Sequence, residues 1–166
     1  MRRGAAGRSR GDRDGSVPLL VPGLAVHGER LMTLDELEAF GVAIGEAAVG
    51  ALPVLVTLSG DLGAGKTTLT RAIGHGFGVV EPVTSPSYAL VHEYTAVAAR
   101  RFFHIDLFRI AGPHELANIG WEGLFSEAAL VVVEWPEHAG GQLPHVALAI
   151  TLAHPDDDET RRRVSW

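Results

Sequence analysis

The chain has 166 residues, of which 46% are hydrophobic and 20% are charged, and it contains no cysteine. This length suits one domain with a sizeable core, and the composition excludes wholesale disorder, a disulfide framework and a cysteine nucleophile. Residues 1–30 hold six arginines and three acids, whereas residues 31–166 hold eight basic and seventeen acidic residues, an excess that disfavours free-standing binding to a nucleic-acid backbone.

The first thirty residues differ in composition from the rest. They are rich in Arg, Gly and Ser without an apolar period, so we predict a disordered basic tail over 1–30 and a single domain over 31–166. An organelle transit segment is the alternative, but Asp12, Asp14 and the many glycines disfavour an amphipathic helix there. The sequence shows no secretory signal and no apolar stretch of roughly 18 residues, so we expect a cytoplasmic protein without a membrane partner.

The domain opens with a helix, a strand and a second helix. Thr33 and Glu36 have the spacing of a capping box, and apolar residues recur at helical spacing as far as Ala48. The run Val54–Leu58 is apolar on both faces, which is typical of a buried parallel strand. A glycine-rich turn follows this strand and leads into a predicted helix over Thr67–Phe77.

The second half of the chain is richer in strands. The patterns predict a hairpin of two strands, a short helix that starts at a proline, a second buried strand and two closing strands: Tyr88–Tyr94, Arg101–Phe108, Pro113–Ile119, Leu130–Trp135, Val146–Leu152 and Arg162–Trp166. The order of these elements predicts an α/β fold, a three-layer sandwich whose mixed sheet has parallel strands in the centre and antiparallel strands at the edges.

Residues Gly60–Thr67 match the phosphate-binding pattern G-x-x-x-x-G-K-[ST] in full, between a strand and a helix. The glycines let backbone N–H groups surround phosphates, and the following helix directs its positive end to the same charge. Lys66, the only lysine in the sequence, is placed to reach the outer phosphates, and the Thr67 hydroxyl is an oxygen ligand suited to Mg²⁺. The motif predicts a P-loop NTPase-like fold.

A P-loop enzyme also needs an acid near the metal, at the end of a neighbouring strand. The apolar run LVVVEW reaches Glu134, and Asp106 is the other acid within an apolar strand, so both are candidates. A structural pair with Arg109 is the alternative interpretation of Asp106.

Other polar residues give no sign of a metal site. The histidines lack metal-ligand spacing, so zinc is not expected, and Asp156–Asp158 is interpreted as a solvated hairpin loop.

Several stretches in one order and spacing resemble the TsaE family of P-loop ATPases, which act in bacterial tRNA threonylcarbamoyladenosine synthesis. The resemblance spans Thr33 to Trp166 and rests on five runs: GDLGAGKTTLTR at 60–71, VTSPSYALVHEY at 83–94, HIDLFRI at 104–110, HELANIGWEGLF at 114–125 and VVEWPE at 132–137. It implies an ATPase that is weak alone and resets a transferase assembly between turnovers. The implied partners are the TsaD-like transferase subunit and its TsaB-like paralogue, with tRNA contacted only through the complex.

The resemblance also implies the roles of particular residues. Gly63, Ala64, Gly65, Lys66, Thr67 and Thr68 would bind the triphosphate of ATP, and Thr67 and Glu134 would hold Mg²⁺. Lys66, Asp106 and Glu134 would be catalytic, Trp135 would lie beside the nucleotide, and Ser85–Tyr88 would form a switch-like loop. Leu37 stands where the family usually has a threonine near the base, and Ser87 and Phe108 replace a commoner Thr and Tyr.

Two other classes of function fit a complete P-loop. A small-molecule kinase has a similar length, but it needs an acceptor pocket and usually a basic lid, for which the middle of the chain offers few arginines. A non-catalytic, nucleotide-gated scaffold would use the same loop for binding alone. A GTPase is disfavoured, because guanine recognition by N-K-x-D needs a second lysine.

Overall fold

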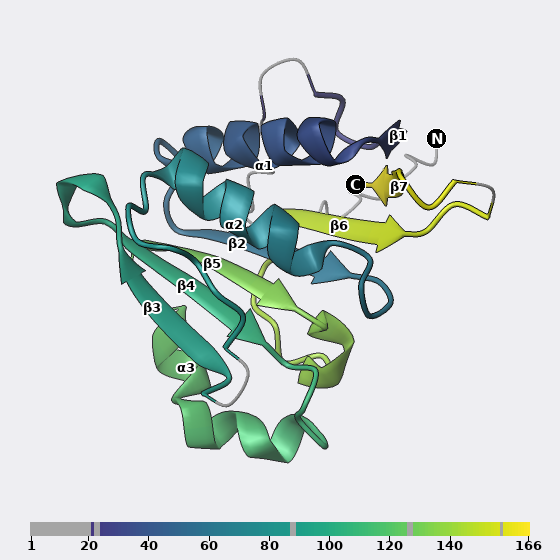
Figure 1. Cartoon of the computed structure of the whole chain (residues 1–166). Coiled ribbons are helices and arrows are strands. Elements are labelled where there is room, and N and C mark those ends of the chain that lie inside the picture. Colours follow the sequence, from purple (N-terminus) through teal and green to yellow (C-terminus); the bar gives the residue numbers. More distant parts are fainter. Residues whose placement is uncertain (1–20, 22–23, 87–88, 126–127, 157) are drawn as a thin grey trace, which may run out of the picture.

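The computed structural model describes residues 21, 24–86, 89–125, 128–156 and 158–166, whose strands form one seven-stranded sheet (Figure 1). The strand order is β1-β7-β6-β2-β5-β4-β3. The parallel centre consists of β6 (Leu148–Ala153), β2 (Val54–Ser59), β5 (Ala129–Glu134) and β4 (Arg101–Asp106). The antiparallel edge strands are β1 (Glu29–Met32), β7 (Arg162–Ser165) and β3 (Val91–Thr95). The predicted mixed sheet is confirmed.

Helices lie on both faces of the sheet and complete the three predicted layers (Figure 1). One face carries α1 (Leu34–Ala48) and α2 (Lys66–Phe77), and the other carries the 3₁₀ helices η2 (Pro113–Ile119) and η3 (Pro136–Ala139) with the short α3 (Trp121–Leu124). Because β5 is buried on both sides, its alternate residues enter different cores. Leu130 belongs to the core below α1 and α2, whereas Val131 packs in the core with Leu116 of η2.

Glycines bring α1 and α2 into close contact. A Cβ atom at Gly45 of α1 would collide with the carbonyl oxygen of Ile73 on α2, and one at Gly76 of α2 would collide with the carbonyl of Val42 on α1. Any side chain at these points would force the two helices apart. The glycines therefore hold α2, whose first residue is Lys66, firmly against α1.

The predicted hairpin is present, with shifted ends. β3 and β4 pair antiparallel, with Val91 opposite Ile105, and the short η1 (Val97–Ala99) lies in their connection. The predicted start of the first of these strands, Tyr88, lies outside the described residues. The short helix predicted at Pro113 is a 3₁₀ helix, and the α3 and η3 turns had no clear signal in the sequence.

The N-terminal edge begins earlier than the predicted boundary at residue 31. β1 starts at Glu29 and pairs with β7, and Gly28 and Trp166 exchange two backbone hydrogen bonds of 2.9 Å. Val21, in the segment before β1, is buried in the core. Sequence patterning missed this strand because it has only four residues and its pairing partner is distant in sequence. The predicted disorder of residues 1–20 lies outside the described part of the chain.

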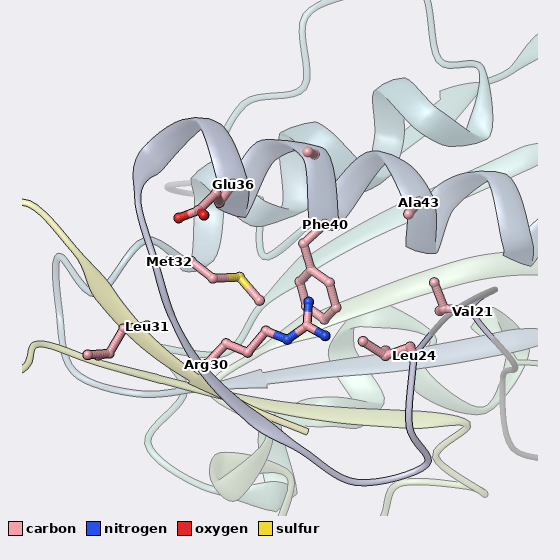
Figure 2. Close-up of a pocket in the computed structure, with 9 residues that line it drawn as sticks. Val21, Leu24, Arg30, Leu31, Met32, Glu36, Phe40 and Ala43 are labelled. Atoms are coloured by element: carbon pink, nitrogen blue, oxygen red, sulfur yellow. The ribbon is translucent and has the colours of Figure 1, made fainter.

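A cavity of about 300 Å³ lies between α1, β1 and the residues near Val21 (Figure 2). Met32, Phe40 and Leu24 give it apolar walls, and it shares no residue with the glycine-rich loop. Among the helices of the described residues, none combines the length and hydrophobicity needed to cross a bilayer.

Candidate functional site

The glycine-rich loop joins β2 to α2 and requires glycine where its backbone turns. Gly60, Gly63 and Gly65 have φ angles of 130°, 80° and 105°, which side chains rarely allow. A Cβ atom at Gly60 would also collide with the carbonyl of Leu152. Gly65 directly precedes Lys66, the first residue of α2, so the loop ends at the positive end of a twelve-residue helix. This is the backbone that an anion-binding loop needs.

The Lys66 side chain lies inside the site and is only 5% exposed. Its ammonium group donates to the carbonyl oxygens of Gly60 at 2.5 Å and Asp61 at 2.8 Å, and lies 3.9 Å from the ring centroid of Trp135. Burial lowers the pKa of Lys66, and the negative charge of Glu134 offsets part of that effect. The ammonium group thus donates to two neutral carbonyl oxygens, and phosphate oxygens could take their place as acceptors.

Glu134 ends β5 and is 2% exposed, with donors on both carboxylate oxygens. Oε2 accepts from the Thr67 hydroxyl at 3.1 Å, and Oε1 lies 3.0 Å from the Thr70 hydroxyl. Oε1 also lies 2.8 Å from Nε2 of His104 on β4. The carboxylate is thus held between the first turns of α2 and the neighbouring strand, which compensates the cost of burying its charge.

His104 is fully buried and contacts two acceptors at once. Its Nδ1 lies 3.0 Å from the backbone oxygen of Thr84, and its Nε2 faces Glu134. A carbonyl oxygen can only accept, so an N–H on Nδ1 would donate to Thr84 and an N–H on Nε2 would donate to the carboxylate. The imidazole therefore bridges the acid of β5 to the backbone before Ser85.

Asp106 ends β4 directly beside Glu134 in the parallel register. It is half-buried, and its Oδ2 accepts from the Ser85 hydroxyl at 3.1 Å while Oδ1 accepts from the Phe108 amide at 3.0 Å. Its negative charge, like that of Glu134, offsets part of the lowering of the Lys66 pKa that burial causes. Of the predicted switch-like loop, Ser85 is therefore at the site, whereas Ser87 and Tyr88 lie outside the described residues.

Trp135 turns the chain sharply away from the end of β5. Its backbone is left-handed with a φ of 59°, which is rare for a bulky residue, and its amide donates to Leu58 at 3.1 Å. The ring centroid lies 5.0 Å from that of Phe108, which is 46% exposed. This conformation places the indole over Lys66.

The predicted residues thus gather at one end of the central strands. Lys66 contacts Trp135, Thr67 contacts Glu134, and Asp106 adjoins Glu134 in the sheet. Ala64 is buried in the loop, and Thr68 is half-buried in the first turn of α2. The buried Leu37 lies next to the loop, because a Cβ atom added to Gly65 would lie 3.3 Å from its side chain.

Two residues that contact Glu134 were not among those predicted from the sequence. Thr70 follows Thr67 by three positions on a helix, a spacing that places both hydroxyls on one face. His104 is a polar residue in the apolar run RFFHIDLF, two positions before Asp106 and therefore on the same side of the strand. Both signals are present in the sequence.

The oxygen donors present fit a Mg²⁺ ion bound together with phosphate. A threonine hydroxyl and a carboxylate, 3.1 Å apart, are hard ligands of the kind that Mg²⁺ prefers. Mg²⁺ usually takes few protein ligands and completes its shell with phosphate oxygens and water. Thr67 and Glu134 are the residues that would hold it.

Comparisons with known proteins place the chain in a family. The family model described as threonylcarbamoyl adenosine biosynthesis protein TsaE matches residues 31–164. The tRNA threonylcarbamoyladenosine biosynthesis protein TsaE of Haemophilus influenzae is 41% identical over 104 residues, covering 63% of this chain and 65% of that protein, just under two thirds of its length. Its Bacillus subtilis counterpart is 32% identical over 127 residues, covering 76% and 78%.

A solved structure shows the same fold. The crystal structure of YdiB from Bacillus subtilis superposes with a TM-score of 0.63 at 27% identity, covering 84% of this chain and 83% of that one. The family match spans the loop, both acids and His104. The chain therefore belongs to the TsaE family.

Proposed function

We propose that this chain binds ATP with Mg²⁺ and hydrolyses it as an accessory protein of tRNA threonylcarbamoyladenosine synthesis, resetting the transferase between turnovers. The observation that carries the proposal is the contact between Thr67, in the first turn after the phosphate loop, and Glu134 at the end of the adjacent strand. Membership of the TsaE family supports the biosynthetic system, and the loop supports the nucleotide.

The triphosphate would occupy the loop from Gly63 to Thr68. Lys66 would leave the carbonyls of Gly60 and Asp61 and donate to phosphate oxygens, which are stronger, charged acceptors. Thr67 and Glu134 would hold the Mg²⁺ ion, which neutralises phosphate charge when bound. Trp135 would remain beside the phosphate-binding lysine and close that side of the site to water.

The two acids suit different tasks. Glu134 is buried and held by three side chains, which favours a fixed ligand position. Asp106 is half-buried and tied to Ser85, so its carboxylate is better placed to orient the attacking water and accept its proton. We assign metal binding to Glu134 and water orientation to Asp106.

The partners proposed are the TsaD-like transferase subunit and its TsaB-like paralogue. The acidic excess of residues 31–166 favours contact with tRNA through these partners instead of directly. A cytoplasmic location is part of the same proposal.

The test is ATP turnover with and without the two partner proteins, with Lys66→Ala as the control. We expect slow turnover by the chain alone, stimulation in the complex, and no activity for the variant in either setting. ATP binding without turnover in any combination would favour the nucleotide-gated scaffold. Phosphate transfer to a small molecule would favour the kinase.

A further inference from the structure

Thr84 and Ser85 are linked to both acids of the site, although they lie on neither strand. The Ser85 hydroxyl donates to Asp106 at 3.1 Å, and the Thr84 carbonyl is joined to Glu134 through the ring of His104. Adjacent residues of one segment are thus connected to the ends of two neighbouring strands.

The rest of this segment is attached to other elements. The Val83 carbonyl accepts from Arg71 Nε of α2 at 3.0 Å, and the Thr84 amide donates to the Tyr94 hydroxyl of β3 at 3.0 Å. His104 supplies the connection from the segment to the predicted metal ligand. Its ring is fully buried, so both contacts are shielded from competing water.

We propose that His104 is a positioning residue that couples Glu134 to the segment 83–86, so that a change at the metal-binding carboxylate is transmitted to Thr84 and Ser85. The inference rests on the proposed function, since it takes Glu134 as a ligand of Mg²⁺. In this structure the Thr67 hydroxyl donates to the Glu134 carboxylate. If both oxygens instead face a Mg²⁺ ion, this hydrogen bond must break and the carboxylate must change its orientation. The His104 ring links that reorientation to the backbone at Thr84.

Two substitutions separate the two contacts. The amide nitrogen of His104→Asn can take the place of Nδ1 and keep the bond to Thr84, but it is too short to reach Glu134. The amide nitrogen of His104→Gln reaches the position of Nε2 and keeps the bond to Glu134, but it loses Thr84. Each variant therefore retains one half of the bridge.

The matched control is His92→Gln. His92 lies opposite His104 in the β3–β4 register, and its Nδ1 contacts the Thr84 hydroxyl at 3.4 Å and the Tyr94 hydroxyl at 3.2 Å. It belongs to the same polar group around Thr84 but has no contact with Glu134 among the described residues. We expect its Mg²⁺ affinity and turnover to stay within about twofold of the parent, because the substitution leaves both contacts of the His104 ring in place.

The first readout is Mg²⁺ binding to the ADP-bound protein, measured by calorimetry. His104→Asn should weaken Mg²⁺ about 10- to 100-fold, the usual effect of losing an outer partner of a ligand, while His104→Gln stays near the parent. ATP turnover should fall in both variants. Parent-like Mg²⁺ affinity and turnover in both variants would overturn the inference.

The second readout is hydrogen exchange of the Thr84 and Ser85 amides. Mg²⁺ with ADP should slow exchange in the parent but not in His104→Asn, and His104→Gln should exchange faster even without ligand. On the unsubstituted protein, ¹⁵N NMR should show the Nε2 signal of His104 moving on addition of Mg²⁺ and ADP. An unmoved signal contradicts the coupling even if the variants fold poorly.

Failure of the inference and failure of the proposed function look different. If the parent binds no Mg²⁺-dependent nucleotide, the proposed function is wrong and the coupling falls with it. If the parent binds and hydrolyses ATP while both His104 variants behave like His92→Gln, only the role of His104 is wrong.

Discussion

The ammonium nitrogen of Lys66 lies 3.9 Å from the ring centroid of Trp135, within the range of a cation–π contact. The same nitrogen donates to two carbonyls of its own loop. The lysine is therefore already directed into the loop, at acceptors that are neutral. Binding a triphosphate requires an exchange of acceptors and no large movement of the backbone.

Lys66→Ala should reduce ATP affinity about 100-fold or more, because bonds between charged groups contribute about 1.5–3 kcal/mol each. Backbone amides and Mg²⁺ alone would then hold the phosphates. Calorimetric titration with ATP measures the loss. Affinity within a few-fold of the parent would show that the loop is not the phosphate site.

Tryptophan fluorescence should report nucleotide binding, because phosphates bound to Lys66 would bring negative charge close to the indole of Trp135. The other tryptophans donate to backbone carbonyls elsewhere, Trp121 to Gln142 and Trp166 to Ala25. We expect ADP to change the emission of the parent and to leave that of Trp135→Phe nearly unchanged. An equal change in both proteins would assign the signal to another tryptophan.

Glu134→Gln should keep ATP binding through Lys66 and lower turnover about 100-fold, since it removes the charge from the proposed metal ligand. Thr67, Thr70 and His104 contact two carboxylate oxygens of Glu134, whereas the amide of glutamine has a single acceptor oxygen. Thermal stability should therefore fall as well. Melting curves and turnover, measured on the same preparation, test both effects.

Asp106→Asn should also impair turnover but cost less stability than Glu134→Gln. The half-buried amide can still accept from the Phe108 backbone and can donate to the Ser85 hydroxyl. A structural pair of Asp106 with Arg109, the alternative given by the sequence, would produce the opposite order of stabilities. If Glu134→Gln stays active and Asp106→Asn is inactive yet stable, the proposed roles of the two acids are reversed.

The capping box of α1 predicts a pH-dependent contribution to stability. Hydrogen bonds from Thr33 lower the pKa of Glu36 below its ordinary value of 4.5. A carboxyl with a lowered pKa stabilises the fold above pH 4.5 and loses that contribution as the pH falls through the folded-state value. Glu36→Gln should therefore destabilise at pH 7 but much less at pH 3, whereas the exposed Glu38→Gln serves as a control in denaturant titrations.

Much of the fold could be predicted because its central elements carry strong local patterns. Val54–Ser59 and Ala129–Glu134 are apolar on both faces, and such runs are strands buried between helical layers. β1 could not be predicted, since its four residues have no alternation and are defined by pairing with β7. Pairing between segments that are far apart in the sequence produces no residue pattern within either segment.

The site was partly predictable for a related reason. Lys66 and Thr67 belong to a contiguous motif whose backbone geometry determines their place. Glu134 was a candidate because an acid at the end of an apolar strand needs compensation. The bridge formed by His104 depends on register between β4 and β5 and on the path of the chain at Thr84, and neither can be read from residue types.

The pairing of β1 with β7 has a consequence for synthesis of the protein. Glu29 and Ser165, whose side chains bond across this edge, are 136 positions apart. On the ribosome β1 emerges early but has no strand to pair with until residues 162–165 have been translated. Its backbone donors and acceptors therefore lack their native partners during that time, and an unpaired strand edge can pair with other chains.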